Sequence, residues 1–248
     1  MQYAAARPDC PVCEDPRQYV PVSGQAWTTM EELQASHENV FRPEGELTGI
    51  GTQPKFGIGQ RALLEPSGVL WDCVTLLDDA TAAEIEARGG LRAIAISHPH
   101  YYSAMVDWGR RFGCEVWLHE DDREWVMRED ACLRFWSGET CDLGEGLTLI
   151  RCGGHFPGGT VLHRGRDLLC GDIVQVIPDR GWVSFMYSFP NHIPLPESEI
   201  RRIERALEPF DFDRLYGAWW GTVIERDGKE IVRRSAQRYV DALHGKLP

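Results

Sequence analysis

Short apolar runs alternate with amphipathic segments along the chain from Gln60 onward. Most runs are bounded by glycine, proline or acidic residues, which favour turns, so the runs predict strands. The longer amphipathic segments predict helices, several of which end at a glycine or before a proline. Predicted strands cover residues 61–64, 69–73, 91–97, 115–119, 147–151, 160–163, 167–170 and 214–217. Predicted helices cover residues 80–88, 102–112, 121–127, 197–207 and 230–243.

Residues 1–59 differ in composition from the rest of the chain, because they are rich in proline, glycine and polar residues and contain few strand-like runs. Thr29 and Glu32 match a capping box, which predicts the start of a short helix. The glycines at 49, 51, 57 and 59 predict a looped connector after that helix. We therefore expect an N-terminal extension over residues 1–59 and one larger domain over residues 60–248.

The composition fits a globular protein that buries a core. The chain has 248 residues, of which 43% are hydrophobic and 26% are charged, and this balance excludes a disordered chain. Because predicted strands and helices alternate in both halves, we expect an α/β or α+β fold with layered sheets and outer helices.

Charge and hydropathy limit the partners that the chain can have. The 26 Lys and Arg against 38 Asp and Glu give a formal net charge of −12, and nucleic acid binding instead needs clustered cations. No apolar run approaches the ~20 residues of a membrane-spanning helix, and the N-terminal residues lack the apolar segment of a signal peptide. We therefore expect a cytoplasmic protein that acts on a small molecule, with no nucleic acid or membrane partner.

The chain contains eight cysteines, but the missing signal segment and the ordinary core composition argue against a disulfide framework. Cys10 and Cys13 form a C-P-x-C pair, the half-site from which zinc ribbons are built, and the other six are interpreted as structural thiols. A complete structural zinc site needs four ligands. His37, or a second subunit of a homodimer, would supply the others. The alternative is a knuckle without metal.

Two histidines carry the strongest functional signal. His98 and His100 directly follow the predicted strand 91–97, and open sheets place ligand sites at the carboxyl ends of their strands. Imidazole suits zinc and iron, although an isolated pair of this kind is more often two loop histidines. Three further motifs favour metal ligands over loop histidines: Asp72 ends a strand, His155 lies in a glycine-rich turn, and Asp172 follows another strand.

These motifs, in this order and each near a strand end, resemble the metallo-β-lactamase fold superfamily from about residue 60 to residue 221. The resemblance implies a four-layer αββα sandwich with a metal site at one edge of its two sheets. It implies that His98, His100 and His155 are metal ligands and that Asp172 is the carboxylate ligand. Asp72 matches an aspartate of the superfamily that usually supports the metal ligands without binding the metal itself. The alternative is that Asp72 caps a nearby backbone group.

The chain departs from the superfamily pattern at the second metal. The superfamily motif H-x-H-x-D-H has Tyr102 and Ser103 at its last two positions here, and Trp219 or Trp220 stands where a late histidine is usual. Phenol and indole do not replace carboxylate and imidazole as ligands of a divalent cation. We therefore expect a mononuclear site, with a metal-free pseudoenzyme as the alternative. His192 is a further candidate for the missing histidine.

Three neutral histidines with an open position match the pattern of catalytic zinc. They predict a zinc-dependent hydrolase of an ester, thioester, lactone or amide carbonyl, in which Asp172 binds the metal or orients the water. Tyr101 or Tyr102 would donate a hydrogen bond to the oxyanion or protonate the leaving group, unless their rings are packed in the core. A substrate with an apolar or aromatic part is predicted from Trp182, Phe185, Tyr187, Phe189, Trp219 and Trp220.

A different chemistry fits some of the same residues. His98, His155 and Asp172 are two histidines and a carboxylate, the composition of non-haem Fe2+ oxygenases. Persulfide dioxygenases of the superfamily resemble this pattern, but they retain the complete H-x-H-x-D-H motif. An Fe2+ dioxygenase and a non-catalytic metal-binding protein are therefore the alternatives to the zinc hydrolase.

Overall fold

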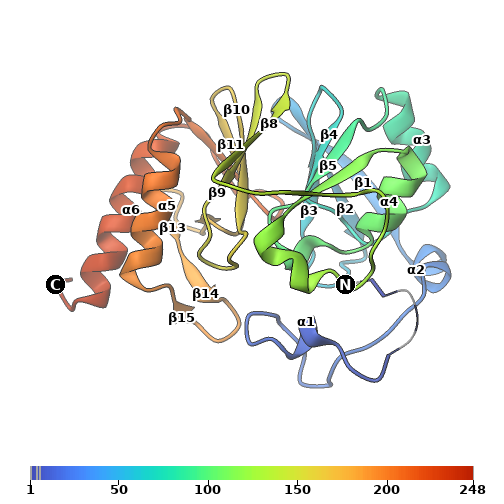
Figure 1. The fold of residues 1–248 in the computed structure, drawn as a ribbon, viewed down its shortest axis with the longest axis horizontal. Helices are drawn as coiled ribbons and strands as arrows, with labels where there is room; N and C mark the ends of the chain where they lie inside the picture. Colours follow the sequence, from blue (N-terminus) through green and yellow to red (C-terminus); the bar gives the residue numbers. More distant parts are fainter. Residues whose placement is uncertain (1, 4, 6, 248) are drawn as a thin grey trace. The chain divides into compact units, whose positions relative to one another are not determined.

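The computed structural model describes residues 2, 3, 5 and 7–247 (Figure 1). Contacts between residues divide the chain into two compact units. The first unit comprises the residues up to Leu118 together with Arg123–Phe135, and the second comprises His119–Asp122 with the chain from Trp136 onward.

The first unit is built on a seven-stranded sheet with the order β1-β2-β3-β4-β5-β6-β7. Neighbours from β1 to β4 are antiparallel, whereas β4, β5 and β6 run parallel. The strands are β1 (Glu38–Glu44), β2 (Leu47–Gln53), β3 (Arg61–Leu64), β4 (Val69–Trp71), β5 (Ala93–Ala95), β6 (Glu115–His119) and β7 (Leu133–Trp136). The α-helices of this part are α1 (Pro11–Glu14), α2 (Met30–Ser36), α3 (Asp79–Ala87) and α4 (Met105–Phe112). Two 3-10 segments cover Pro99–Tyr101 and Glu120–Trp125.

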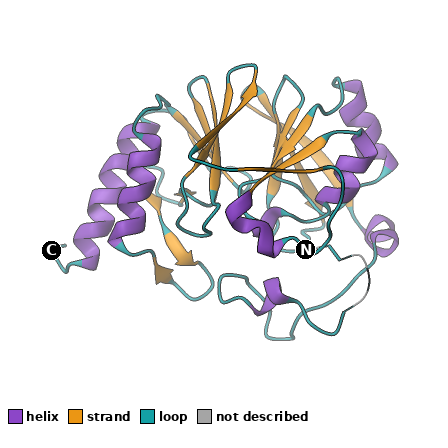
Figure 2. Ribbon diagram, in the orientation of Figure 1, coloured by secondary structure: helices purple, strands orange, loops and turns teal. Residues whose placement is uncertain are grey.

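The second unit is built on a six-stranded sheet with the order β17-β16-β11-β10-β9-β8. Its last two helices lie side by side along one face of that sheet (Figure 2). The strands are β8 (Thr140–Gly144), β9 (Leu147–Arg151), β10 (Thr160–Arg164), β11 (Asp167–Gly171), β16 (Arg214–Gly217) and β17 (Val223–Ile224). The helices are α5 (Glu197–Leu207) and α6 (Gly228–Leu243). Two small sheets pair β12 (Gln175–Val176) with β13 (Val183–Ser184), and β14 (Met186–Ser188) with β15 (Ile193–Pro194).

Helical periodicity explains how α5 packs on the second sheet. Ile200, Ile203 and Leu207 recur at helical spacing and are all buried, so they form one apolar face. They join a core cluster with Ile150 of β9 and Val161 of β10. Each side chain buried in this way stabilises the fold by roughly 1.5–3 kcal/mol relative to an exposed one.

The mixed α/β class is confirmed, and several elements have the predicted bounds. β3, β9, α5 and β16 coincide with the predicted segments. The Thr29 side chain accepts from the Glu32 backbone N–H, and the Glu32 side chain accepts from the Thr29 backbone N–H, which confirms the capping box.

The predicted looped connector before residue 60 is wrong at Gly49 and Gly51, whereas Gly57 and Gly59 do lie in a loop, between β2 and β3. Gly49 and Gly51 lie inside β2, which pairs with β1 on one side and β3 on the other. The first sheet therefore crosses the expected boundary between residues 59 and 60. Glycine is disfavoured in strands when local propensity alone is weighed, but pairing on both sides holds β2 in the sheet. The helix predicted over 121–127 is a 3-10 segment, and the helix predicted over 102–112 begins only at Met105.

The cysteines follow the expectation except at one pair. Cys10 and Cys13 are joined in a disulfide, and the other six are free thiols. In the part of the chain that the structure describes, no helix combines the length and the apolar character needed to cross a bilayer.

Gly109 provides a test of packing in the first unit. It lies inside α4, where alanine would ordinarily favour the helix by about 1 kcal/mol. A Cβ at this position would lie 2.9 Å from the Cys132 Sγ and 2.9 Å from a Val116 methyl. Overpacking of this kind costs about 1–3 kcal/mol. We therefore expect Gly109→Ala to lower the free energy of unfolding, as measured by urea denaturation.

The matched control is Gly109→Ala in a Cys132→Ala background, which removes one of the two close contacts. The added alanine should cost less there than in the wild-type background. A Gly109→Ala variant that is more stable than wild type would show that helix propensity outweighs packing at this position.

Candidate metal centre

Parallel pairing brings Asp72 and His98 to one edge of the first sheet. Trp71, the last residue of β4, lies opposite Ala95, the last residue of β5. The Asp72 backbone N–H donates to the Ala95 carbonyl at 2.8 Å. The residue after β4 and the residues after β5 are therefore close together, as the carboxyl ends of parallel strands must be.

A chain of hydrogen bonds fixes the orientation of His98. The Ser97 backbone N–H and hydroxyl both donate to Asp72 Oδ1 at 2.8 Å. The Ser97 oxygen then lies 3.0 Å from His98 Nδ1. Because the single hydroxyl proton of Ser97 is given to Asp72, its oxygen accepts from Nδ1–H. The Nε2 of His98 is thereby left as the nitrogen with a lone pair for a metal.

Burial changes the ionisation of Asp72. The side chain is 2% exposed, and this removal from water raises the pKa of its carboxyl to about 7. The two bonds from Ser97 and the more distant charge of Arg61 act in the opposite direction. Asp72 thus combines the two roles considered for it, because it caps the loop after β5 and also supports His98 through Ser97.

A glycine-rich turn in the second unit presents His155. Gly153 and Gly154 have φ values of 70° and 80°, a left-handed conformation that glycine adopts without strain. A Cβ on Gly154 would lie 3.0 Å from Leu195 and 3.1 Å from Ile203, so the turn also packs closely on neighbouring side chains.

The orientation of His155 is fixed by the main chain. Its Nδ1 lies 2.7 Å from the Tyr187 carbonyl. A carbonyl only accepts, so Nδ1 carries the proton and Nε2 offers the lone pair. The rings of Phe156 and Phe189 lie 5.0 Å and 5.5 Å from the His155 ring, between ring centroids. The buried histidine therefore has aromatic neighbours.

Asp172 follows β11 at the corresponding edge of the second sheet. β11 runs parallel to β16, with Gly171 opposite Gly217. Asp172 is 3% exposed. The same pairing places the chain that follows β16, with Trp219, at this edge of the sheet.

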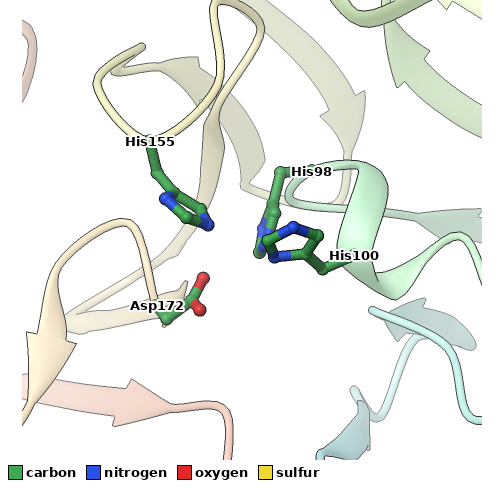
Figure 3. Close-up of side chains that lie close together, drawn as sticks. All are labelled: His98, His100, His155 and Asp172. Carbon is green, nitrogen blue, oxygen red and sulfur yellow. The ribbon is translucent and has the colours of Figure 1, made fainter. Parts of the chain in front are cut away.

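The four predicted ligands form a cluster (Figure 3). One ligand atom from each of His98, His100, His155 and Asp172 lies within 4.8 Å of the other three. Two atoms bound to one zinc ion at about 2.0–2.2 Å lie about 3–4 Å apart. The upper limit of 4.8 Å on these separations is therefore close to the spacing of ligands around a single metal ion. Three imidazoles with one carboxylate are a donor set that zinc and iron both accept.

The side chains at the positions of the missing second-metal ligands are buried or take part in other hydrogen bonds. Ser103 donates to the Cys73 carbonyl at 3.2 Å and lies 3.3 Å from the Gln60 amide nitrogen, inside a buried polar network. Tyr102 is buried. His192 lies in an exposed turn and is not part of the cluster.

The aromatic residues expected around the site are divided among several places. Phe189 neighbours His155, and Tyr187 contributes its carbonyl. Phe185 instead packs in the core of the second unit. Trp182 stacks against Arg234 and Arg238, whose guanidinium carbons lie 5.0 Å and 4.1 Å from its ring. Tyr101 is buried, and the centroid of its ring lies 4.5 Å from that of His98.

Cys10 and Cys13 form no larger ligand cluster among the described residues. Cys10 caps the short helix α1, and its sulfur accepts from the Cys13 backbone N–H at 3.2 Å. A zinc ion at this pair stays a prediction that would require reduction of the disulfide to thiolates and ligands from elsewhere.

Comparison with known proteins identifies the family. No family model matches the chain. The uncharacterized protein YmaE of Bacillus subtilis (strain 168) is 48% identical over 250 residues, which cover 96% of this chain and 91% of YmaE. The chain belongs to the YmaE family.

Solved structures place this YmaE-family protein in the metallo-β-lactamase fold. A B3 metallo-β-lactamase with an active-site glutamic acid matches 94% of this chain and 97% of its own, with a TM-score of 0.52 and 17% identity. A flavo di-iron protein from Thermotoga maritima matches 84% of this chain, with a TM-score of 0.53 and 13% identity. The match spans 63% of the di-iron protein's length. The resemblance stated from the sequence motifs is confirmed at the level of the fold.

Ser97 was not among the residues that the motifs singled out, and it yields a direct test in this YmaE-family protein. Ser97→Ala removes the hydroxyl that joins His98 to Asp72. Loss of a partner that orients a metal-binding histidine typically costs about 10–100-fold in metal affinity. We expect Ser97→Ala to lower zinc affinity by about that factor, as measured by a chelator-competition titration. Ser103→Ala is the matched control, and equal effects of the two variants would contradict the orienting role.

Asp72 yields a prediction about the pH dependence of stability. An unfolded Asp titrates near pH 4, whereas the folded carboxyl has a pKa of about 7. Between these values the folded state holds a proton that the unfolded state has released, so raising the pH favours unfolding. The free energy of unfolding should fall across this range by up to about 1.4 kcal/mol per pH unit from this group.

Asp72→Asn removes that titration while keeping an oxygen for Ser97. Urea denaturation of metal-free protein at several pH values between about 4 and 8 should therefore show a flatter profile for the variant. Wild-type and variant curves that run parallel over the whole range would contradict the raised pKa.

Proposed function

We propose that this protein is a metal-dependent hydrolase with one zinc ion, which acts on an ester, thioester or lactone carbonyl. The observation that carries the proposal is the cluster of three imidazoles and one carboxylate within 4.8 Å. Neutral histidines that each offer one nitrogen are the usual ligands of a hydrolytic zinc ion. The metallo-β-lactamase that shares the fold supports the same class of reaction.

The residues of this chain have separable roles in that proposal. His98, His100 and His155 would hold the ion, and Asp172 would either complete the ligand set or orient the attacking water. When bound, zinc lowers the pKa of a coordinated water to about 7 and polarises a carbonyl. Tyr101 and Tyr102 are the nearest phenols in sequence to the ligands, and we assign to one of them a hydrogen bond to the oxyanion or the leaving group.

A single metal ion fits the side chains better than two. Of the usual ligands of a second ion, the aspartate and histidine positions carry Tyr102 and Ser103, and Ser103 is engaged with Gln60 and Cys73. Phe156 and Phe189 beside His155 support a substrate with an apolar or aromatic part. A small-molecule substrate and a cytoplasmic location are likewise part of the proposal.

The alternative is a mononuclear Fe2+ dioxygenase of the persulfide dioxygenase type. His98, His155 and Asp172 have the right composition, and the flavo di-iron protein shows that the same fold is found in an iron protein. Elemental analysis of the purified chain separates the two. About one zinc per chain favours the hydrolase, and iron with oxygen uptake on thiol substrates favours the dioxygenase. The absence of bound metal after chelator-free preparation would leave only a binding function.

Removing one ligand tests the hydrolase directly. We expect His155→Ala to lower zinc affinity by more than the ~10–100-fold that follows from losing a ligand's partner, and to abolish hydrolysis of an aryl ester, thioester and lactone panel. His163→Ala is the matched control, because His163 contacts the Asp211 carbonyl and is not in the cluster. All measurements are repeated with Cys10→Ser, so that zinc at the cysteine pair is not counted. Full zinc content and activity in His155→Ala would overturn the site.

A further inference from the structure

The N-terminal part of the first unit contains a pocket that the proposed hydrolase does not use. Its volume is about 610 Å³, within the range of small-molecule sites. Residues between Gln2 and Leu33 form most of the wall, and Phe56, Gly57, Thr75 and Ala104 complete it. Neither the three histidines nor Asp172 belong to its lining.

Four aromatic side chains contribute to the wall of this pocket. Tyr3, Tyr19, Trp27 and Phe56 all line it. The centroids of the Tyr3 and Trp27 rings lie 5.3 Å apart at an interplanar angle of 74°, which is an edge-to-face contact between two rings of the wall. Tyr19 is 59% exposed and Trp27 is 48% exposed. Large aromatic side chains that gather around a hollow while staying accessible indicate a binding surface.

The charge of the lining residues favours a cationic ligand over an anionic one. Among the described lining residues, Glu32 is the one charged side chain, and none is a lysine, arginine or histidine. Glu32 Oε2 accepts from the Thr29 backbone N–H and the Thr28 hydroxyl, both at 3.0 Å. These bonds lower the pKa of Glu32, so its carboxylate is ionised at neutral pH. An anionic ligand would be repelled.

Tyr3 is held in position by a neighbour. Its hydroxyl donates to the Cys10 sulfur at 3.2 Å, and both Cys10 and Cys13 belong to the wall. Outside the lining, Arg7 lies 5.2 Å from the Tyr3 ring and pairs with Asp9 at 3.0 Å. The ring is thus already in contact with one cation.

We propose that this pocket binds an organic cation, an amine or quaternary ammonium compound with apolar substituents. The faces of aromatic rings carry partial negative charge and attract such cations, and several rings around one hollow are the usual way in which proteins recognise quaternary ammonium groups. Glu32 adds a full negative charge at the same wall. The apolar substituents gain from the removal of aromatic and aliphatic surface from water. This proposal is independent of the hydrolytic site.

Choline and its uncharged carbon analogue, 3,3-dimethylbutanol, test the proposal. The two probes have similar shape and differ in charge. Isothermal titration calorimetry on the full-length protein should show saturable binding of choline, with about one site per chain. The analogue should bind about 5-fold or more weakly, because it lacks the attraction between a cation and the rings.

Paired variants locate the site. Glu32→Gln removes the charge but keeps the capping box, in which glutamine also serves. Glu31→Gln removes the same charge from the neighbouring position of the same helix, which does not line the pocket. Choline affinity should fall several-fold in Glu32→Gln and stay unchanged in Glu31→Gln. Trp27→Leu should lose binding, and Trp27→Phe should retain part of it.

Three outcomes would overturn the proposal. The first is absence of saturable choline binding, and the second is equal affinity for 3,3-dimethylbutanol. The third is an equal effect of Glu31→Gln and Glu32→Gln. Self-association that Trp27→Leu abolishes, without any choline binding, would show instead that a second copy of the chain covers this pocket.

Discussion

Burial of polar ligands is the constraint on which the candidate site depends. His98 and His155 are each 1% exposed, and a buried imidazole needs a partner for the nitrogen that does not face a metal. His98 finds that partner in Ser97, which is itself held by Asp72, and His155 finds it in the Tyr187 carbonyl. In both cases the proton is on Nδ1. The two partners differ chemically but give the same result, a fixed ring in which Nε2 carries the lone pair.

The strand pairing explains why the functional residues follow strands. Parallel pairing of β4 with β5 brings Asp72 to Ser97, and parallel pairing of β11 with β16 brings Asp172 to the segment after Gly217. At the ends of parallel strands the backbone leaves the sheet, so side chains there are not needed to fill the space between layers. The residues at these strand ends can therefore change without loss of packing in the core. The use of Ser103 in a polar network with Gln60 and Cys73 is one such variation.

The N-terminal segment has two parts, strands of the first sheet and residues that line the aromatic pocket. β1 and β2 extend the first sheet, whereas the residues before them form the wall of the aromatic pocket. A disulfide between Cys10 and Cys13 and a capping box at Thr29 constrain the described part of this segment locally, although it contains little regular structure. A segment so constrained loses less conformational entropy when a ligand binds, which favours recognition of small molecules.

The sequence by itself determined the elements whose signals are local. The turns, caps and apolar runs gave β3, β9, α5, β16 and the capping box at Thr29, and the order of motifs indicated His98, His100, His155 and Asp172 as ligands. The sequence did not reveal β1 and β2, because glycine-rich strands such as β2 are held by pairing with their neighbours. Nor did it reveal the Ser97 bridge, the Tyr187 carbonyl or the pocket. Each of these depends on groups that are distant along the chain, and only tertiary structure brings such groups within hydrogen-bond or van der Waals distance.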